Sequence, residues 1–111
     1  MNDQELEQRL QEIGANAPRL TPERIMSKIQ KEQFIRLPGS TLTICVLTLV
    51  NGYELVGHSA CASPENYNQE IGEKLAKERA VRQIWELEGY VLKNQLLAIE
   101  VMKNDYLQAK E

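Results

Sequence analysis

The stretch TLTICVLTLVNGYELVGHSACA (residues 41–62) decides the fold, because it joins two runs of β-branched and aliphatic residues at an Asn-Gly pair. Asn-Gly is well suited to the positive φ angles of a type I′ turn, so residues 51–52 predict an antiparallel β-hairpin with a two-residue loop. This loop fixes the register of the two strands, and it places Cys45 opposite His58.

Both faces of the predicted hairpin are apolar. One face carries Cys45, Leu47, Leu49, Val56 and His58, and the other carries Leu42, Ile44, Val46, Val50, Tyr53 and Leu55. A two-stranded sheet alone is marginally stable in water. We therefore expect helices to cover one face, and a second subunit or further strands to cover the other face or extend the edges.

The length of 111 residues predicts a single domain over residues 1–111. Within it we expect a helix that can fray over residues 1–17, a core over residues 18–102 and a loose tail over residues 103–111. The formal net charge is −3, and without a basic excess or a Lys/Arg run we expect no binding to polymeric nucleic acid.

No apolar run approaches the roughly 20 residues that span a bilayer, and the N-terminus lacks the basic start and apolar core of a signal peptide. The sequence therefore predicts a protein of the cytoplasm that does not bind a membrane. In that compartment Cys45 and Cys61 are expected to be reduced thiols.

Three helices are predicted around the hairpin. Residues 3–13 carry Leu and Ile at helical spacing. A clearer start signal lies at Thr21-Pro22, from which a second helix is expected to run to about Phe34. The same signal recurs at Ser63-Pro64, where the longest helix is expected to begin and to continue to about Met102.

The long helix carries two apolar stripes. Tyr67, Ile71, Leu75, Trp85, Leu92 and Leu96 form one, and Ala76, Ala80, Ile84, Leu87 and Val91 form the other. One stripe can cover the hairpin, and the second needs another helix or another subunit. Gly72 indicates close packing and Gly89 a kink or break.

These elements predict an α+β fold with short N-terminal helices, a two-stranded antiparallel hairpin and a long C-terminal helix. The free hairpin face and the second helix stripe predict a homo-oligomer, either a dimer or a larger ring.

Candidate catalytic chemistry is sparse. The only histidine, His58, is the predicted neighbour of Cys45, and the two could form a nucleophile pair or half of a metal site. Two ligands are too few for a metal ion, so no metal, no cofactor and no catalytic residue is predicted. A small hydrolase that uses Cys45 and His58 remains an alternative.

Five residues are candidates for binding an anionic ligand. Arg82 lies on the first apolar stripe, either in an ion pair with Glu78 or presented to an anion with Arg79 on its flank. Asn66 and Tyr67 lie at the predicted helix start, where unpaired N–H groups favour negative charge.

Tyr90 completes the set of five candidates, which rests on side-chain chemistry alone.

A family resemblance covers residues 18–97. It is carried by the segments PRLTPERI, TLTICVLTLVNGYELVGHSACASPENYNQEIG and AKERAVRQIWELEGYVL. The combination of C-x-L-x-L-x-N-G, G-x-S-A-C, P-x-N-Y, I-G and I-W-E-L-E-G-Y resembles a family of short proteins encoded by tailed phages and prophages, most of them of unknown function.

The chain is also similar to the type 1 Thoeris anti-defence proteins. The resemblance implies an oligomeric sponge that binds a cyclic ADP-ribose type signal, made by a bacterial TIR-domain enzyme, without cleaving it. It identifies no binding residue in this sequence. The alternative function is a small phage accessory protein that binds a host or phage protein through an apolar surface.

Overall fold

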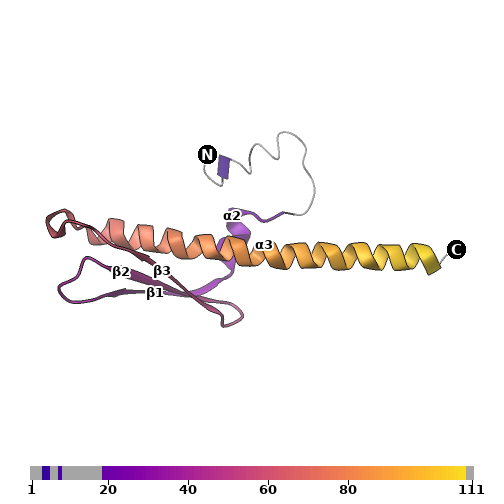
Figure 1. Cartoon of the computed structure of the whole chain (residues 1–111), viewed down its shortest axis with the longest axis horizontal. Coiled ribbons are helices and arrows are strands. Elements are labelled where there is room, and N and C mark those ends of the chain that lie inside the picture. The colour runs from indigo at the N-terminus through magenta and orange to yellow at the C-terminus, as the bar shows by residue number, and fades with distance from the viewer. Residues whose placement is uncertain (1–3, 6–7, 9–18, 110–111) are drawn as a thin grey trace.

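The computed structural model of the chain describes residues 4, 5, 8 and 19–109. Its elements are α2 (Pro22–Ser27), β1 (Ile29–Arg36), β2 (Thr43–Leu49), β3 (Glu54–Ser59), the 3₁₀ helix η1 (Pro64–Asn66) and α3 (Gln69–Ala109). The strands form one antiparallel sheet in the order β1-β2-β3, and α3 crosses one of its faces (Figure 1). The α+β class is confirmed, and most of the helix predicted over residues 3–13 lies outside the described residues.

The predicted two-stranded sheet is wrong, because a third strand occupies most of the predicted second helix. The helix start is correct: the Thr21 hydroxyl accepts a hydrogen bond from the Arg24 amide at 3.2 Å, and Pro22 follows. However, α2 ends at Ser27 and β1 begins at Ile29. Pairing β1 with β2 satisfies an edge that a lone hairpin would leave open, and this tertiary gain outweighs the local helical pattern.

The hairpin turn has three residues rather than two. The Leu49 amide donates to the Tyr53 carbonyl and the Gly52 amide to the Leu49 carbonyl, each at 2.8 Å. Gly52 has a φ of 91°, whereas Asn51 has a negative φ, which excludes a type I′ turn. A type I turn that ends in a left-handed glycine bulge fits this geometry.

The longer turn shifts the register by one residue, so the predicted facing of β3 is wrong. Cys45 pairs with Gly57, and His58 pairs with Ile44. Because side chains alternate along a strand, a shift of one residue moves every β3 side chain to the opposite face. Cys45 therefore faces α3 and is buried, whereas His58 lies on the outer face and is exposed.

The core lies between the sheet and the first half of α3. Its buried side chains are Ile25, Cys45, Leu47, Leu49, Leu55, Ala76, Ala80 and Ile84. Helix α3 contributes Ala76, Ala80 and Ile84 to this core. These residues belong to the second predicted apolar stripe, and one stripe was expected to cover the hairpin. A Cβ atom at Gly57 would collide with the Ala76 carbonyl and the Ala80 amide, so only glycine permits this approach of helix to strand.

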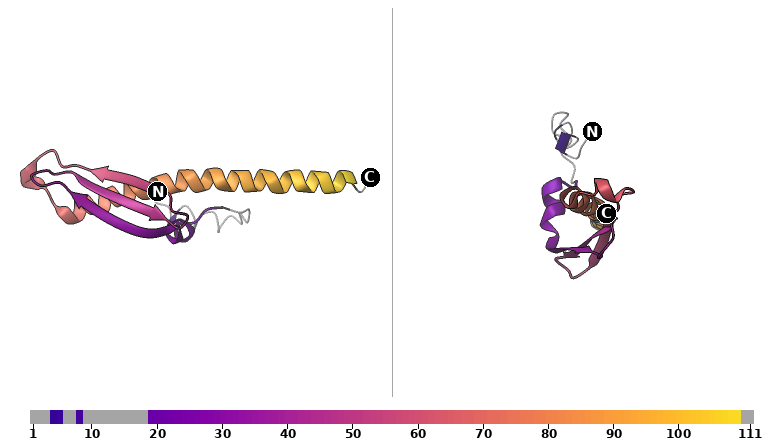
Figure 2. Two further views of the ribbon diagram at one scale, coloured as in Figure 1. Left: turned by 90° about the horizontal axis from the view of Figure 1, so that it is seen from below. Right: turned by 90° about the vertical axis from the view of Figure 1, so that its left-hand side faces the viewer.

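The two helical glycines behave differently. A Cβ atom at Gly72 would lie 2.9 Å from the Thr43 hydroxyl oxygen, which confirms the predicted close packing. The predicted kink or break at Gly89 is wrong, because α3 continues through it without interruption (Figure 2). The helix is longer than predicted and ends at Ala109 rather than Met102.

The start of α3 also differs from the prediction. Ser63 was expected to cap it, but the Ser63 hydroxyl donates to the Glu65 carboxylate at 2.6 Å. Tyr67 has extended backbone angles (φ −66°, ψ 132°), which separate η1 from α3. Asn68 caps α3 instead, because its side-chain oxygen accepts from the Ile71 amide at 3.1 Å.

Half of α3 projects beyond the sheet. Its 41 residues correspond to a length of about 60 Å, and the molecule measures 72 × 33 × 20 Å. Exposed apolar side chains of the projecting half include Tyr90, Val91, Leu97, Ile99, Val101, Met102, Tyr106 and Leu107. None of the described helices combines the length and the apolar character needed to cross a membrane.

Candidate functional site

A hollow of about 190 Å³ lies at the start of α3, between η1 and the adjacent ends of β2 and β3. Its lining residues are Thr41, Ser59, Ala60, Cys61, Asn66, Tyr67, Asn68, Ile71, Gly72 and Leu75. Most of its wall is apolar, with amide, hydroxyl and phenol groups at the margins. Two of the five predicted ligand-binding residues, Asn66 and Tyr67, therefore share one concave surface.

Buried hydroxyl groups fix the base of the hollow. Thr43 and Ser59 form a cross-strand pair and are only 1% and 4% exposed. The Ser59 hydroxyl donates to the Gly72 carbonyl at 2.7 Å, and the Thr43 hydroxyl shares a hydrogen bond of 3.3 Å with the Tyr67 hydroxyl. Because both buried groups have partners, they hold Tyr67 and the first turn of α3 in place.

Arg36 contacts the hollow's aromatic wall, and the sequence did not identify it as a candidate. Its guanidinium carbon lies 4.2 Å from the centre of the Tyr67 ring, a cation–π contact. Arg36 is exposed and ends β1. Its position depends on β1 being a strand, so no local sequence signal could have placed it beside Tyr67.

Asn66 and Asn68 have different roles at this site. Asn68 is occupied as the cap of α3. Asn66 is exposed, so its side-chain amide is accessible to a ligand in the hollow. The first turn of α3 adds N–H groups and the positive end of a helix dipole, which favour an anion nearby.

Arg79 has a structural partner. Its Nη1 atom donates to the His58 carbonyl at 2.7 Å, and Gln83 Nε2 donates to the Val56 carbonyl at 2.7 Å. The two side chains therefore cap the free edge of β3. Arg79 also lies about one helical turn beyond Leu75 in the hollow's wall, so it is near the hollow but already engaged.

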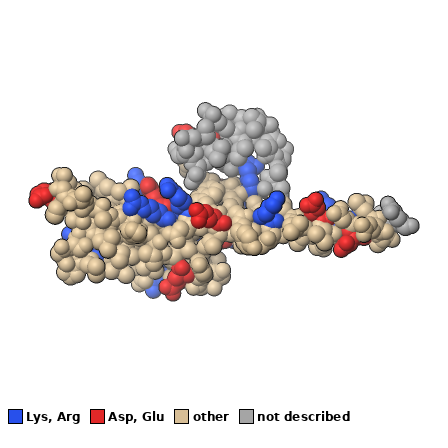
Figure 3. Space-filling view, viewed as in Figure 1, with Lys and Arg blue, Asp and Glu red and all other residues tan. Residues whose placement is uncertain are grey.

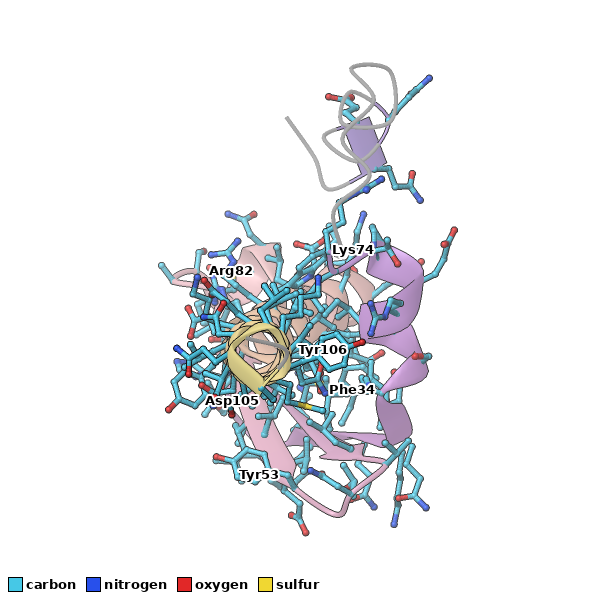
Figure 4. The ribbon with its side chains drawn as sticks, turned by 90° about the vertical axis from the view of Figure 1, so that its right-hand side faces the viewer. Phe34, Tyr53, Lys74, Arg82, Asp105 and Tyr106 are labelled. Carbon is cyan, nitrogen blue, oxygen red and sulfur yellow. The ribbon has the colours of Figure 1, made fainter. Side chains whose placement is uncertain are left out.

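Arg82 and Tyr90 lie farther from the hollow. Arg82 is exposed on the side of α3 that faces away from the sheet (Figure 4). Within residues 19–109 it forms no ion pair with Glu78, whereas Lys77 and Glu32 do pair, at 2.8 Å. Tyr90 is 71% exposed and lies about 22 Å along the helix from Leu75, too far to reach the hollow of its own chain.

The two cysteines are free thiols, and the Cys45 side chain is buried. Burial keeps reactants away from its sulfur atom. Burial raises the pKa of the Cys45 thiol, the negative charge of Glu32 raises it further, and Lys77 opposes both. A buried, protonated thiol is a poor nucleophile. Because His58 lies on the other face of the sheet, the predicted Cys45–His58 pair does not form.

Charged side chains of both signs lie on the visible face of the molecule (Figure 3), and no metal site is found among the described residues. Basic and acidic side chains are interspersed along α3 on the face shown in Figure 3. Among the residues described, no three His, Cys, Asp or Glu side chains are grouped to hold a metal ion.

A family model matches most of the chain. Residues 20–96 match the model of the phage protein (N4 Gp49/phage Sf6 gene 66) family, a stretch that includes the whole sheet, the hollow and the first two thirds of α3. No curated protein and no solved structure matches the chain. Because the family model covers more than half of the sequence, the chain belongs to the phage protein (N4 Gp49/phage Sf6 gene 66) family.

Proposed function

We propose that this phage-family protein is a non-catalytic binding protein that sequesters an anionic cyclic nucleotide signal of host immunity, of the cyclic ADP-ribose or cyclic oligonucleotide type. The observation that carries the proposal is the hollow at the start of α3. Its chemistry matches the parts of a nucleotide, and the nucleophile expected of a hydrolase is buried elsewhere.

Each part of a nucleotide has a partner at the hollow. The Tyr67 ring offers a surface for base stacking, and the Asn66 amide can both donate to and accept from a base or a ribose. The helix start and the Arg36 guanidinium supply positive potential for phosphate. The apolar wall, with Ile71 and Leu75, completes a surface that is mostly apolar with few polar groups, as small-molecule sites are.

The size of the hollow supports a site completed by a second copy of the chain. At about 190 Å³ it is smaller than the roughly 300 Å³ at which small-molecule pockets begin. A bound nucleotide would therefore project from it. In a homo-oligomer, Arg82 and Tyr90 of a second copy, both exposed here, are available to cover the projecting part, and the distal half of α3 supplies apolar surface for assembly.

The family context agrees with this proposal. A sponge acts by mass action: it lowers the free signal only if it is abundant and binds more tightly than the host receptor. A small phage-encoded chain needs no catalytic group for that task. The resemblance to type 1 Thoeris anti-defence proteins points in the same direction.

Native mass spectrometry tests the proposal. The purified protein is measured before and after incubation with lysate from cells in which a TIR or cyclic-oligonucleotide defence has been triggered. We expect a discrete oligomer that gains a few hundred daltons per site and releases the ligand unchanged on denaturation. An oligomer that gains no mass, or that releases a cleaved nucleotide, contradicts the proposal.

Matched variants locate the site. Asn66→Ala should weaken ligand binding about five- to thirtyfold, because a hydrogen bond to a bound polar group contributes about 1 to 2 kcal/mol. Asn94→Ala removes the same amide from an exposed position in the distal half of α3 and serves as the control. Equal affinities for the two variants would show that the ligand binds elsewhere.

The second candidate function is binding to a host or phage protein. It is favoured by the exposed apolar side chains of the distal helix, including Leu97, Ile99 and Met102, because grouped apolar side chains on a surface often mark a protein-binding site. Arg82→Ala separates the candidates. It should weaken a nucleotide site completed by a second copy, and it should leave an apolar protein contact unchanged.

A further inference from the structure

The two edges of the sheet differ in how the rest of the chain covers them. At the β3 edge, side chains of α3 bind the carbonyls of Val56 and His58. At the β1 edge, no hydrogen bond to the outward main-chain groups of Glu32, Phe34 or Arg36 is present among the described residues. An open edge of unpaired N–H and C=O groups is a template for another strand.

The hydrogen-bond pattern identifies which β1 groups point outward. The Leu49 amide bonds toward β3, and in an antiparallel sheet successive residues bond to alternate sides. The β2 residues that bond toward β1 are therefore Ile44, Val46 and Thr48, and their β1 partners are Ile35, Gln33 and Lys31. The remaining residues, Glu32, Phe34 and Arg36, present their N–H and C=O groups to the outside.

The outward edge is accessible. Helix α3 packs mainly on β2 and β3 and reaches β1 through the ion pair of Lys77 with Glu32. These side-chain contacts leave the outward main-chain groups of β1 without a hydrogen-bond partner among the described residues. All eight side chains of β1 are exposed or half-buried, and the strand contains no proline. The segment from Glu32 to Arg36 thus has the length and the regular geometry for main-chain pairing.

We propose that β1 pairs edge to edge and antiparallel with β1 of a second copy of this chain, with Phe34 opposite the partner's Phe34 and Glu32 opposite the partner's Arg36. This pairing forms about six main-chain hydrogen bonds. It joins the two three-stranded sheets into one continuous sheet of six strands.

Charge selects both the occupant and the register. Only registers that bring outward residues opposite each other can form the ladder. Centring the pair on Glu32 would oppose two like carboxylates, and centring it on Gln33 would place Glu32 against Phe34. Centring it on Phe34 makes two Glu32–Arg36 pairs by symmetry, which is favourable for cross-strand neighbours.

The side chains are already arranged for this register. Glu32 uses Oε2 to bind Lys77, so Oε1 remains for the partner's Arg36. The Arg36 guanidinium rests on the Tyr67 ring, which orders it on the same face of the sheet as Glu32. On the outer face, the exposed Ile35 of one copy comes opposite the partner's Gln33.

The edge pairing requires nothing to bind in the hollow, although it uses the same Arg36 side chain that contacts Tyr67 there. It also differs from association through α3, since it uses main-chain groups of a strand at the opposite side of the sheet. The experiment that tests it must therefore report on β1 alone.

Disulfide trapping in the full chain provides that readout. Gln33→Cys and Ile35→Cys, each in a Cys61→Ala background, are mixed and mildly oxidised. In the proposed register residues 33 and 35 of the two copies form a non-hydrogen-bonded pair about 4.5 Å apart between Cα atoms, within the range that a disulfide spans. We expect a covalent dimer in the mixture and much less in either variant alone.

Charge reversal provides a second, non-covalent test. Arg36→Glu should weaken association at the β1 edge about tenfold, because two attractive pairs become repulsive. Combining it with Glu32→Arg restores opposite charges and should restore trapping of the cysteine pair. Lys31→Glu makes the same change of charge on the same strand but outside the Glu32–Arg36 pairs, so it serves as the control.

Three results would contradict the proposed edge pairing. A mixture that traps no more dimer than the single variants excludes the register, and a double reversal that traps no better than Arg36→Glu excludes the charge pairing. A protein that stays monomeric by light scattering at millimolar concentration would show that any strand docking at β1 comes from a different protein.

Discussion

At the scale of single residues, glycine and alanine determine how closely α3 approaches the sheet. Gly57 lies against the backbone of Ala76 and Ala80, and a Cβ atom there would also lie 2.9 Å from the Ala80 Cβ. The neighbouring atoms belong to backbone and to a short side chain, so they cannot rotate away. The contact therefore depends on the hydrogen atom of Gly57 and the short methyl groups of Ala76 and Ala80 rather than on large apolar side chains.

Gly57→Ala should destabilise the fold by about 3 kcal/mol, because it overpacks a rigid contact. Gly89→Ala is the matched control: its added methyl group meets only Leu20 Cδ1, at 4.0 Å, and alanine favours a helix. That variant should be about 1 kcal/mol more stable than the natural chain. Chemical denaturation followed by circular dichroism measures both, and equal stabilities would contradict the packing described.

The two thiols should differ in reactivity and in their effect on stability. Cys45 is fully buried, so an aromatic disulfide reagent should modify Cys61 first and Cys45 only after unfolding. Burial raises the pKa of Cys45 above its ordinary value of 9.0, so above about pH 9 the unfolded thiol ionises while the folded thiol stays neutral. The free energy of unfolding should therefore fall with rising pH, and it should fall less in Cys45→Ala.

At the scale of elements, two similar start signals lead to different structures. Thr21-Pro22 begins α2 as its residues predict. Ser63-Pro64 begins only the 3₁₀ turn η1, because Tyr67 is extended and bonds to Thr43 on β2. The local sequence could not predict this difference between the two helix starts, because Tyr67 bonds to a residue of a strand 24 positions earlier.

Asn68→Ala should destabilise the fold by about 1 kcal/mol, because Asn68 supplies the cap of α3. Ser63→Ala should have little effect, since the Ser63 hydroxyl binds the exposed carboxylate of Glu65 rather than a helix amide. Thermal melts of the two variants under the same conditions decide between the caps. A larger loss of stability for Ser63→Ala than for Asn68→Ala would show instead that Ser63 is the more important cap.

The helical stripe of Ala76, Ala80 and Ile84 and the close packing at Gly72 could be predicted from the sequence, because both depend on spacing within one element. The strand β1 could not, since Ile29 and Phe34 fit either structure until β2 offers an edge to pair with. The turn was missed because Asn-Gly serves two hairpin geometries that differ by one residue. The sequence predicted that Asn66 and Tyr67 lie at one site, but it did not predict that Arg36 lies beside Tyr67.

At the scale of the whole molecule, the sheet and α3 differ greatly in length. Side chains of residues 97–109 are all exposed. A chain that ends at Leu96 should therefore keep the stability of the sheet and its helix within about 1 kcal/mol, because every described side chain that it loses is exposed. If copies associate through the distal helix, the same truncation should lower the mass measured by light scattering.

Failure of the truncated chain to fold would show that residues 97–109 stabilise the core by a contact beyond the described residues. Retention of the full oligomer after truncation would instead assign assembly to another surface, such as the edge of β1.

The length of α3 gives the molecule two regimes of local opening. Amides near Ala76 and Ala80 exchange with solvent only when the sheet separates from the helix. Amides beyond the sheet are held by helical hydrogen bonds alone, and a segment of that length frays readily in water. Hydrogen exchange should therefore fall in protection along a single uninterrupted helix, and the position of the boundary should move toward Ala109 whenever another chain binds the distal half.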